Sequence, residues 1–205
     1  MTLLQYELAS TLLPGIGSKL SKTLISYCGS ADAVFTSTIQ QIRKIPGIGE
    51  KTITAIHQHR EEALRRSEQI LQSCQKKGIE VLHYTHERYP SRLKQISDAP
   101  AILFCRGNSA LKYPKSVAIV GTRKATDYGK RITEEIVEQL KPHNPVIISG
   151  LAYGIDIAAH KAALTQGLPT IGILAGGLDK IYPAVHKDIA HKMQQEGALI
   201  SENKP

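Results

Sequence analysis

The stretch Ser116–Val117–Ala118–Ile119–Val120–Gly121–Thr122–Arg123 decides the fold, because it reads as a buried strand that runs into a tight, charged turn. The run that ends at Val120 is short, apolar and largely β-branched, and Gly121 follows where the backbone must turn sharply. Apolar residues then return at helical spacing, with Thr126 or Asp127 as the expected helix cap. Strand, glycine turn and helix together form the first unit of an open α/β sheet.

The turn after this strand is a candidate phosphate-binding site. Ligands of open α/β sheets bind at the carboxyl ends of the strands, where the strand order reverses and helix N-termini favour anions. Arg123 adds a planar, permanent positive charge two residues after Gly121. Neither a G-x-G-x-x-G fingerprint nor a P-loop is present, since the next glycine is Gly129. The alternative is that Gly121 only makes a turn and Arg123 points into solvent.

Three later segments repeat the pattern of an apolar strand that ends in small residues. They predict strands over 145–150, 169–174 and 198–201, with helices over 157–165 and 186–195. The strand ends carry Ser149–Gly150, Ala175–Gly176–Gly177 and Ser201, which leave room for a ligand and expose backbone donors. The sequence therefore predicts an α/β, mostly parallel, Rossmann-like sheet.

Basic and aromatic residues follow these turns. Lys180 and Lys187 are placed to join Arg123 at the carboxyl edge, and Tyr153 and Tyr182 are placed to stack bases there. The alternatives are that the lysines are solvated surface residues and that Tyr182 packs beside the proline that follows it.

Asp156 and His160 stand four residues apart and share a helix face. A metal pair or an acid–base dyad is one interpretation. We favour a structural one, in which Asp156 caps the helix and His160 hydrogen-bonds to it, because two ligands are one short of even a catalytic zinc site. Ser149 lacks a G-x-S-x-G elbow, so no hydrolase nucleophile is expected. No metal and no cofactor are expected.

An internal repeat marks the helical region over residues 1–72. The sequence LPGIGSK at 13–19 recurs as IPGIGEK at 45–51, an offset of 32 residues. Both copies resemble the turn of a helix-hairpin-helix motif, whose backbone N–H groups can meet a DNA phosphate. The alternative is a packing or protein-contact module. The possible secondary DNA contacts are Gly15, Gly17, Lys19, Gly47, Gly49 and Lys51.

Charge and composition favour a polyanionic partner for the second part of the chain. The 205 residues carry a net charge of +8. Residues 1–75 hold eight Lys/Arg and six Asp/Glu, a net +2, whereas residues 76–205 hold eighteen and twelve, a net +6. A composition shift near residues 74–78 predicts a helical tandem helix-hairpin-helix domain over 1–75 and a Rossmann-like domain over 76–205.

The sequence favours a cytoplasmic protein. It contains no run of about 18 apolar residues and no signal-peptide pattern at its N-terminus. Its three cysteines, Cys28, Cys74 and Cys105, are odd in number and far apart, which is typical of reduced thiols.

Several motifs in order resemble the DNA processing protein A (DprA/Smf) family. They are VAIVGTRKATDYGK, VIISGLAYGIDIAAHKAAL, TIGILAGGLDKIYPAVHK and ALISE, and the resemblance covers residues 76 to 202. It implies an extended Rossmann fold, preceded by a SAM-like helical domain. It also implies a homodimer that is not an enzyme, binds single-stranded DNA without nicotinamide or ATP, and hands incoming strands to the RecA recombinase during natural transformation.

The resemblance also assigns residues. The family's G-[ST]-R contact falls on Gly121, Thr122 and Arg123, with Lys124 beside it. Its basic pocket falls on Ser149–Gly150 with Tyr153, and on the stretch from Gly177 through Lys180 to Lys187.

The chain departs from the family pattern in three places. Tyr153 stands where a basic residue is common, and His186 where an asparagine is common. The family pattern also continues past the last residues here, so the chain is expected to lack a C-terminal part that carries dimer surface.

Two other functions remain open. Rossmann-like nucleotide phosphoribohydrolases share the architecture and carry a P-G-G-x-G-T stretch with a following glutamate, but the nearest match here, at 175–179, lacks both the Gly-Thr and the acid. A protein-binding adaptor that works through the helical domain is the third interpretation.

Overall fold

The computed structural model describes residues 1–107 and 114–205, which form two compact units. The first unit contains residues 1–77 and 81–103, and the second contains residues 78–80 and 104–205. The predicted boundary between residues 75 and 76 placed 81–103 in the second domain. They group with the helices because, for example, the Lys22 ammonium donates a hydrogen bond to the Ala99 carbonyl at 2.7 Å. The division into two folding domains stays a prediction.

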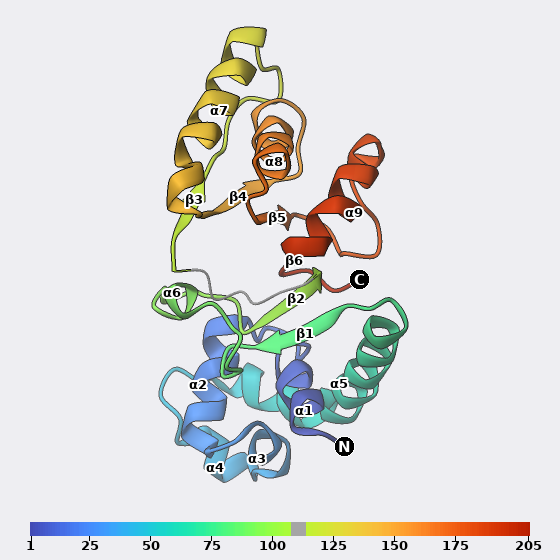
Figure 1. Ribbon diagram of the computed structural model, residues 1–205. Helices are drawn as coiled ribbons and strands as arrows, with labels where there is room; N and C mark the ends of the chain where they lie inside the picture. Colours follow the sequence, from blue (N-terminus) through green and yellow to red (C-terminus); the bar gives the residue numbers. More distant parts are fainter. Residues whose placement is uncertain (108–113) are drawn as a thin grey trace. The chain divides into compact units, whose positions relative to one another are not determined.

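Five helices build most of the first unit (Figure 1). Three of them begin at a hydroxyl side chain that accepts a backbone N–H, namely Thr2, Ser30 and Thr38. A core that includes Leu24, Val34 and Ile42 holds them together. The helices are α1 (Leu3–Ser10), α2 (Ser18–Cys28), α3 (Ala31–Thr36), α4 (Ile39–Arg43) and α5 (Glu50–Lys76); β1 (Glu80–His83) and α6 (Ser91–Lys94) follow.

The two predicted hairpins are confirmed. Gly15 joins α1 to α2 with a φ of 73°, and Gly47 joins α4 to α5 with a φ of 80°. These left-handed conformations favour glycine, which explains why both copies of the repeat carry it. Gly17 and Gly49 then precede α2 and α5, and no side chain caps either helix.

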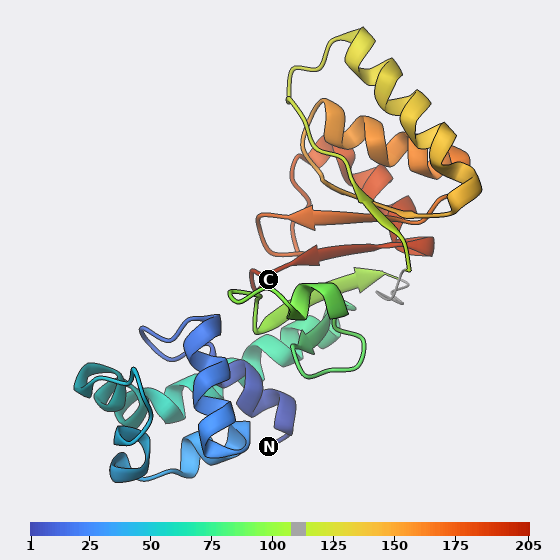
Figure 2. The same ribbon diagram turned by 90° about the vertical axis from the view of Figure 1, so that its left-hand side faces the viewer.

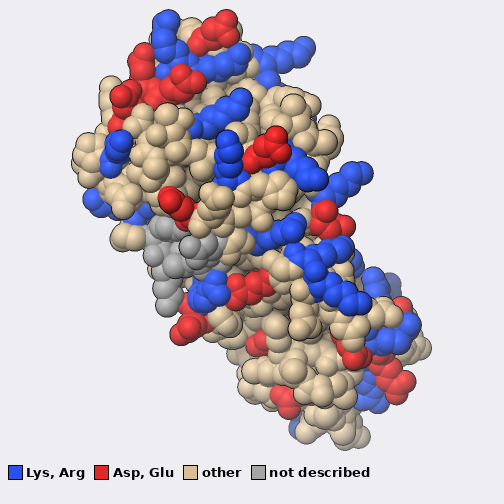
Figure 3. All heavy atoms as spheres, turned by 45° about the vertical axis from the view of Figure 1, so that its right-hand side comes forward, with Lys and Arg blue, Asp and Glu red and all other residues tan. Residues whose placement is uncertain are grey.

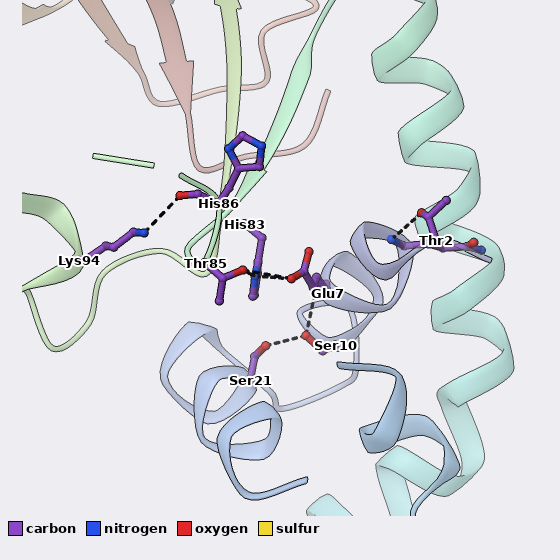
Figure 4. Close-up of polar contacts among 9 residues, drawn as sticks. Thr2, Glu7, Ser10, Ser21, His83, Thr85, His86 and Lys94 are labelled. Atoms are coloured by element: carbon purple, nitrogen blue, oxygen red, sulfur yellow. Dashed lines mark hydrogen bonds and ion pairs between the residues drawn. The ribbon is translucent and has the colours of Figure 1, made fainter. Parts of the chain in front are cut away.

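A buried polar contact ties β1 to α1 (Figure 4). The His83 Nδ1 lies 2.7 Å from the Glu7 carboxylate and 2.7 Å from the Thr85 hydroxyl, which donates to the same carboxylate at 3.2 Å. Nearby, the Ser10 and Ser21 hydroxyls are 2.6 Å apart and join α1 to α2. The first unit therefore depends on polar contacts as well as on its apolar core.

The second unit is a mostly parallel α/β sheet, which confirms the predicted fold class. Strand β2 pairs antiparallel with β6, and β6, β5, β4 and β3 pair parallel in that order. Strand β1 extends the sheet beside β2. The elements are β2 (Ile102–Gly107), β3 (Ser116–Ala118), α7 (Asp127–Leu140), η1 (Lys141–His143), β4 (Val146–Gly150), α8 (Ile155–Gln166), β5 (Thr170–Leu174), η2 (Ala184–His186), α9 (Lys187–Glu196) and β6 (Ala198–Ser201).

The three helices of this unit cover one face of the sheet (Figures 1 and 2). Each parallel strand is added on the same side of the previous one, so right-handed crossovers place every connecting helix on the same face. That face carries Ile147 beside α7 and α8, Thr170 beside α8 and Gly172 beside α9. The site is predicted to lie where the strand order reverses, but among the described strands β3 to β6 the order runs in one direction.

Most predicted boundaries agree to within a few residues. Strand β3 ends at Ala118 rather than Val120, although the Ile119 N–H still donates to the Ile148 carbonyl at 2.9 Å. Thr126 caps α7, as predicted. The three cysteines are free thiols. Among the described helices, none combines the length and apolar character of a membrane span.

Candidate functional site

A hollow of about 260 Å³ opens at the carboxyl ends of β4 and β5. Strand β4 contributes Gly150 and the residues after it, and β5 contributes Ile173, Leu174 and the small residues that follow. The parallel pairing of the two strands brings both ends to the same edge of the sheet. The complete lining is Arg123, Gly150, Leu151, Ala152, Tyr153, Ile173, Leu174, Ala175, Gly176, Lys180, Tyr182 and Pro183.

The only charged residues of the lining are two cations. Arg123 and Lys180 are both exposed. Neither side chain makes a hydrogen bond or ion pair with a residue that the structure describes. Two such cations at the rim of one hollow attract an anion, and the arginine can bind it with two parallel hydrogen bonds.

Apolar and aromatic surface makes up much of the rest of the hollow. Ile173 is 45% exposed although it lies in a central strand, and Tyr182 is 77% exposed. The Tyr153 ring stands edge-on to the buried ring of His186, with 5.1 Å between the ring centroids. Exposed aromatic faces next to cations suit a flat, apolar ring that carries a negative group.

The start of α8 holds the Arg123 turn in place. The Ile155 N–H donates to the Thr122 carbonyl at 3.2 Å. A Cβ on Gly154 would collide with that same carbonyl, and a Cβ on Gly121 would lie 2.6 Å from the Ile155 side chain. The glycines at this turn are therefore required by the close approach of α8, which fixes where Arg123 begins.

The structure brings together four of the predicted site residues, Arg123, Gly150, Tyr153 and Lys180. Other predicted residues lie close by but outside the lining. Thr122 accepts a hydrogen bond from the Lys124 N–H at 3.1 Å, so its hydroxyl stabilises the turn. Ser149 is only 2% exposed and donates to the Ile119 carbonyl at 2.5 Å.

Two further predicted residues also stand apart from the hollow. Gly177 packs against the backbone of Lys204, because a Cβ added to Gly177 would lie 2.6 Å from the Lys204 carbonyl oxygen. Lys187 is exposed on the first turn of α9 and is not part of the lining. The exposed hairpin residues Gly15, Gly17, Lys19, Gly47, Gly49 and Lys51 belong to the first unit.

The predicted contact between Asp156 and His160 is wrong. Gly154 precedes α8 without a side-chain cap, so Asp156 is not the capping residue. The His160 Nε2 instead lies 2.6 Å from the Gly150 carbonyl, and its Nδ1 lies 2.7 Å from the Thr170 hydroxyl. The histidine thus joins α8 to β4 and β5, and both ring nitrogens are occupied, which leaves neither for a metal.

Sequence reasoning missed most of the apolar lining. The sequence predicts only strand or turn positions for the four apolar lining residues Leu151, Ala152, Ile173 and Leu174, because a strand pattern does not tell which face of the strand stays open. Tyr182 is among the residues predicted from the sequence, and its neighbour Pro183 is a weak signal for a turn in the loop; the peptide bond between them is cis.

Charge on one face of the protein does not single out another site. On the face drawn in Figure 3, lysine and arginine side chains are spread widely, with carboxylates among them. The hollow differs because its lining includes no carboxylate.

Comparison with known proteins gives two family matches. The model of the DNA recombination-mediator protein A family matches residues 80–205, and that of the SAM-like helix-hairpin-helix tandem matches residues 7–62. DNA processing protein DprA of Bacillus subtilis is 31% identical over 93% of this chain and 64% of its own length. DprA of Streptococcus pneumoniae is 42% identical over 57% of this chain and 41% of its own length. The chain thus spans less than two thirds of these relatives.

Comparison with solved structures gives the same family. The structure of S. pneumoniae DprA covers the whole chain with a TM-score of 0.77 at 28% identity, and the match includes 69% of that protein. A structure of DNA processing protein A from Helicobacter pylori, which describes the single-stranded DNA binding mode of that protein, covers 62% of the chain with a TM-score of 0.54 at 34% identity, over 56% of its own length. The resemblance seen in the sequence is confirmed: the chain belongs to the DNA recombination-mediator protein A (DprA/Smf) family.

Proposed function

We propose that this protein binds single-stranded DNA in the hollow at the carboxyl ends of β4 and β5. Arg123 and Lys180 hold the phosphates, and Tyr153 and Tyr182 contact the bases. Stacking on a ring face requires an unpaired base, so the site favours a single strand over a duplex. Binding by charge and stacking carries little sequence preference, which suits a protein that meets any incoming strand.

The observation that carries the proposal is a pair of cations that have no partner within residues 1–107 and 114–205 and that lie beside exposed tyrosine rings. The same lining favours binding over catalysis. It holds no carboxylate, histidine, cysteine or serine among its residues, whereas a phosphoribohydrolase would need an acidic group at the reacting bond.

The wider role follows from the family. We propose that the protein acts in the cytoplasm, protects incoming single strands and loads the RecA recombinase during natural transformation, as a homodimer in the full-length form. The two hairpins of the first unit form a possible second DNA contact. Their glycine turns are exposed, and the space around the glycines is open, so a phosphate can approach the backbone.

Fluorescence anisotropy with labelled oligonucleotides tests the proposal. We expect single-stranded DNA to bind at least about tenfold more tightly than a duplex of the same length, and Arg123→Ala to weaken binding of the single strand by about tenfold. Lys141→Ala is the matched control. Lys141 is exposed at the end of α7, and because β4 begins shortly after it, it lies at the opposite edge of the sheet.

Two outcomes would contradict the proposal. Equal binding of wild type and Arg123→Ala would remove the hollow as the DNA site. Release of free base from nucleoside monophosphates would instead support the phosphoribohydrolase interpretation.

A further inference from the structure

One buried histidine links the two walls of the hollow. His186 lies in the segment after β5, where its N–H donates to the Pro183 carbonyl at 3.0 Å. Its ring reaches across to the residues after β4, and the His186 Nδ1 lies 2.8 Å from the Leu151 carbonyl. Leu151 and Pro183 both line the hollow, whereas His186 is 7% exposed and lies outside the described lining. The histidine therefore joins the two segments from behind.

The contact with Leu151 fixes the orientation of the His186 imidazole. A carbonyl oxygen only accepts hydrogen bonds, so the His186 Nδ1 carries a proton and donates it. Both residues are buried, so rotating the ring would take this hydrogen bond from two groups that water does not easily reach. The ring of His186 therefore has one preferred position.

That fixed ring supports the ring of Tyr153. The two ring centroids are 5.1 Å apart and the rings meet at 66°, which is the edge arrangement that aromatic pairs prefer. In this arrangement at least one face of the Tyr153 ring stays clear of His186, and Tyr153 is 49% exposed. Tyr153 thus combines a supported side with an exposed surface, and it lines the hollow.

The backbone that follows Tyr153 is fixed as well. Gly154 has a φ of 81° and packs so closely against the Thr122 carbonyl that a Cβ on Gly154 would collide with it. Since Thr122 immediately precedes Arg123, the segment that carries Tyr153 is held at one end by His186 and at the other by the turn of the arginine. The position of the tyrosine is therefore set before a strand binds, which lowers the entropy that binding must cost.

We propose that His186 is a positioning residue that holds the Tyr153 ring as a platform for one base of the bound strand. This role rests on the proposed DNA binding and makes the affinity depend on a base as well as on phosphates. Stacking of one base on an aromatic ring strengthens binding by about tenfold. A strand without bases keeps its phosphates and loses this contribution.

Fluorescence anisotropy with two labelled oligonucleotides of equal length tests the role. One strand carries deoxyadenosine throughout, and the other is built from abasic spacers. We expect wild type to bind the first about tenfold more tightly. His186→Asn keeps an N–H donor for the Leu151 carbonyl but lacks the ring, so it should weaken binding of the deoxyadenosine strand by about threefold to tenfold. The affinity for the abasic strand and the salt dependence should keep their wild-type values.

A double-mutant cycle with Tyr153→Leu separates positioning from a general effect on the structure. Tyr153→Leu alone should remove most of the preference for the strand with bases. In that background, His186→Asn should change the affinity by less than about twofold, because the ring that it positions is gone. His143→Asn, at an exposed histidine, is the matched control and should leave both affinities unchanged. Equal losses from His186→Asn with and without the Tyr153 ring would overturn the role.

The outcomes distinguish this role from the proposed function. If Arg123→Ala weakens binding but His186→Asn and Tyr153→Leu act additively, His186 is not a positioning residue and the DNA site stands. If wild type binds neither strand, both proposals are wrong. Should His186→Asn fail to fold, nuclear Overhauser contacts of the wild-type chain decide. The Tyr153 and His186 ring protons should stay in contact when the strand binds, and Tyr153 should gain contacts with base protons; failure of either would overturn the role.

Discussion

Acid is expected to destabilise this protein partly through one buried histidine. His160 is 0% exposed, and its burial lowers its pKa from 6.5 to about 4. The folded-state pKa lies below the unfolded one, so as the pH falls the unfolded chain binds the proton first. The contribution is therefore complete above pH 6.5 and is lost as the pH falls toward 4. The difference between these pKa values corresponds to about 3 kcal/mol of unfolding free energy.

Urea unfolding followed by circular dichroism over this pH range measures the effect. We expect His160→Gln to remove about 3 kcal/mol of pH dependence relative to wild type, whatever its stability at neutral pH. His143→Gln, at an exposed histidine of η1, should keep the wild-type profile. The reasoning is refuted if His160→Gln and wild type lose stability in parallel as the pH falls.

Three further predictions concern the turns and the first unit. Gly154→Ala should lower the free energy of unfolding by roughly 1–3 kcal/mol and weaken oligonucleotide binding, because the new Cβ would collide with the Thr122 carbonyl. The loss of stability is measured as a lower Tm, and an unchanged Tm would contradict this prediction. Replacing both Lys19 and Lys51 with alanine should lower the affinity for a long oligonucleotide less than about tenfold and leave the affinity for a short one unchanged, as measured by fluorescence anisotropy. Equal losses of affinity for the two oligonucleotides would rule out a second DNA contact at the hairpins. Glu7→Ala should lower the free energy of unfolding, measured with urea, by about 3 kcal/mol because it removes the buried partner of His83. A decrease of less than about 1 kcal/mol would show that the contact between Glu7 and His83 does not stabilise the fold.

The strands and helices of this chain could be predicted because their signals are local. Short β-branched runs between glycines, as at 145–150, and helical periodicity, as at 127–140, need no information from distant residues. The two hairpin turns could be predicted for the same reason, since Gly15 and Gly47 adopt backbone conformations that few other residues tolerate.

The site was predicted less completely because its residues depend on contacts between distant segments. Ser149 follows the pattern of an exposed small residue, yet its hydroxyl turns to the carbonyl of Ile119, thirty residues earlier. Asp156 and His160 share a helix face, yet the imidazole turns to β4 and β5 because the Gly150 carbonyl and the Thr170 hydroxyl are there. A motif gives the position of a residue along the chain, and the packing of the sheet decides which way its side chain points.

The dependence of DNA affinity on salt tests the central claim most directly. Each phosphate held on a single strand contributes about 0.7 to the slope of log affinity against log salt concentration. Replacing both Arg123 and Lys180 with alanine should therefore make that slope shallower by about 1.4 for a single-stranded oligonucleotide. The Lys141→Ala control should keep the wild-type slope. A double variant whose slope equals that of wild type would show that the hollow does not hold the phosphates of the strand.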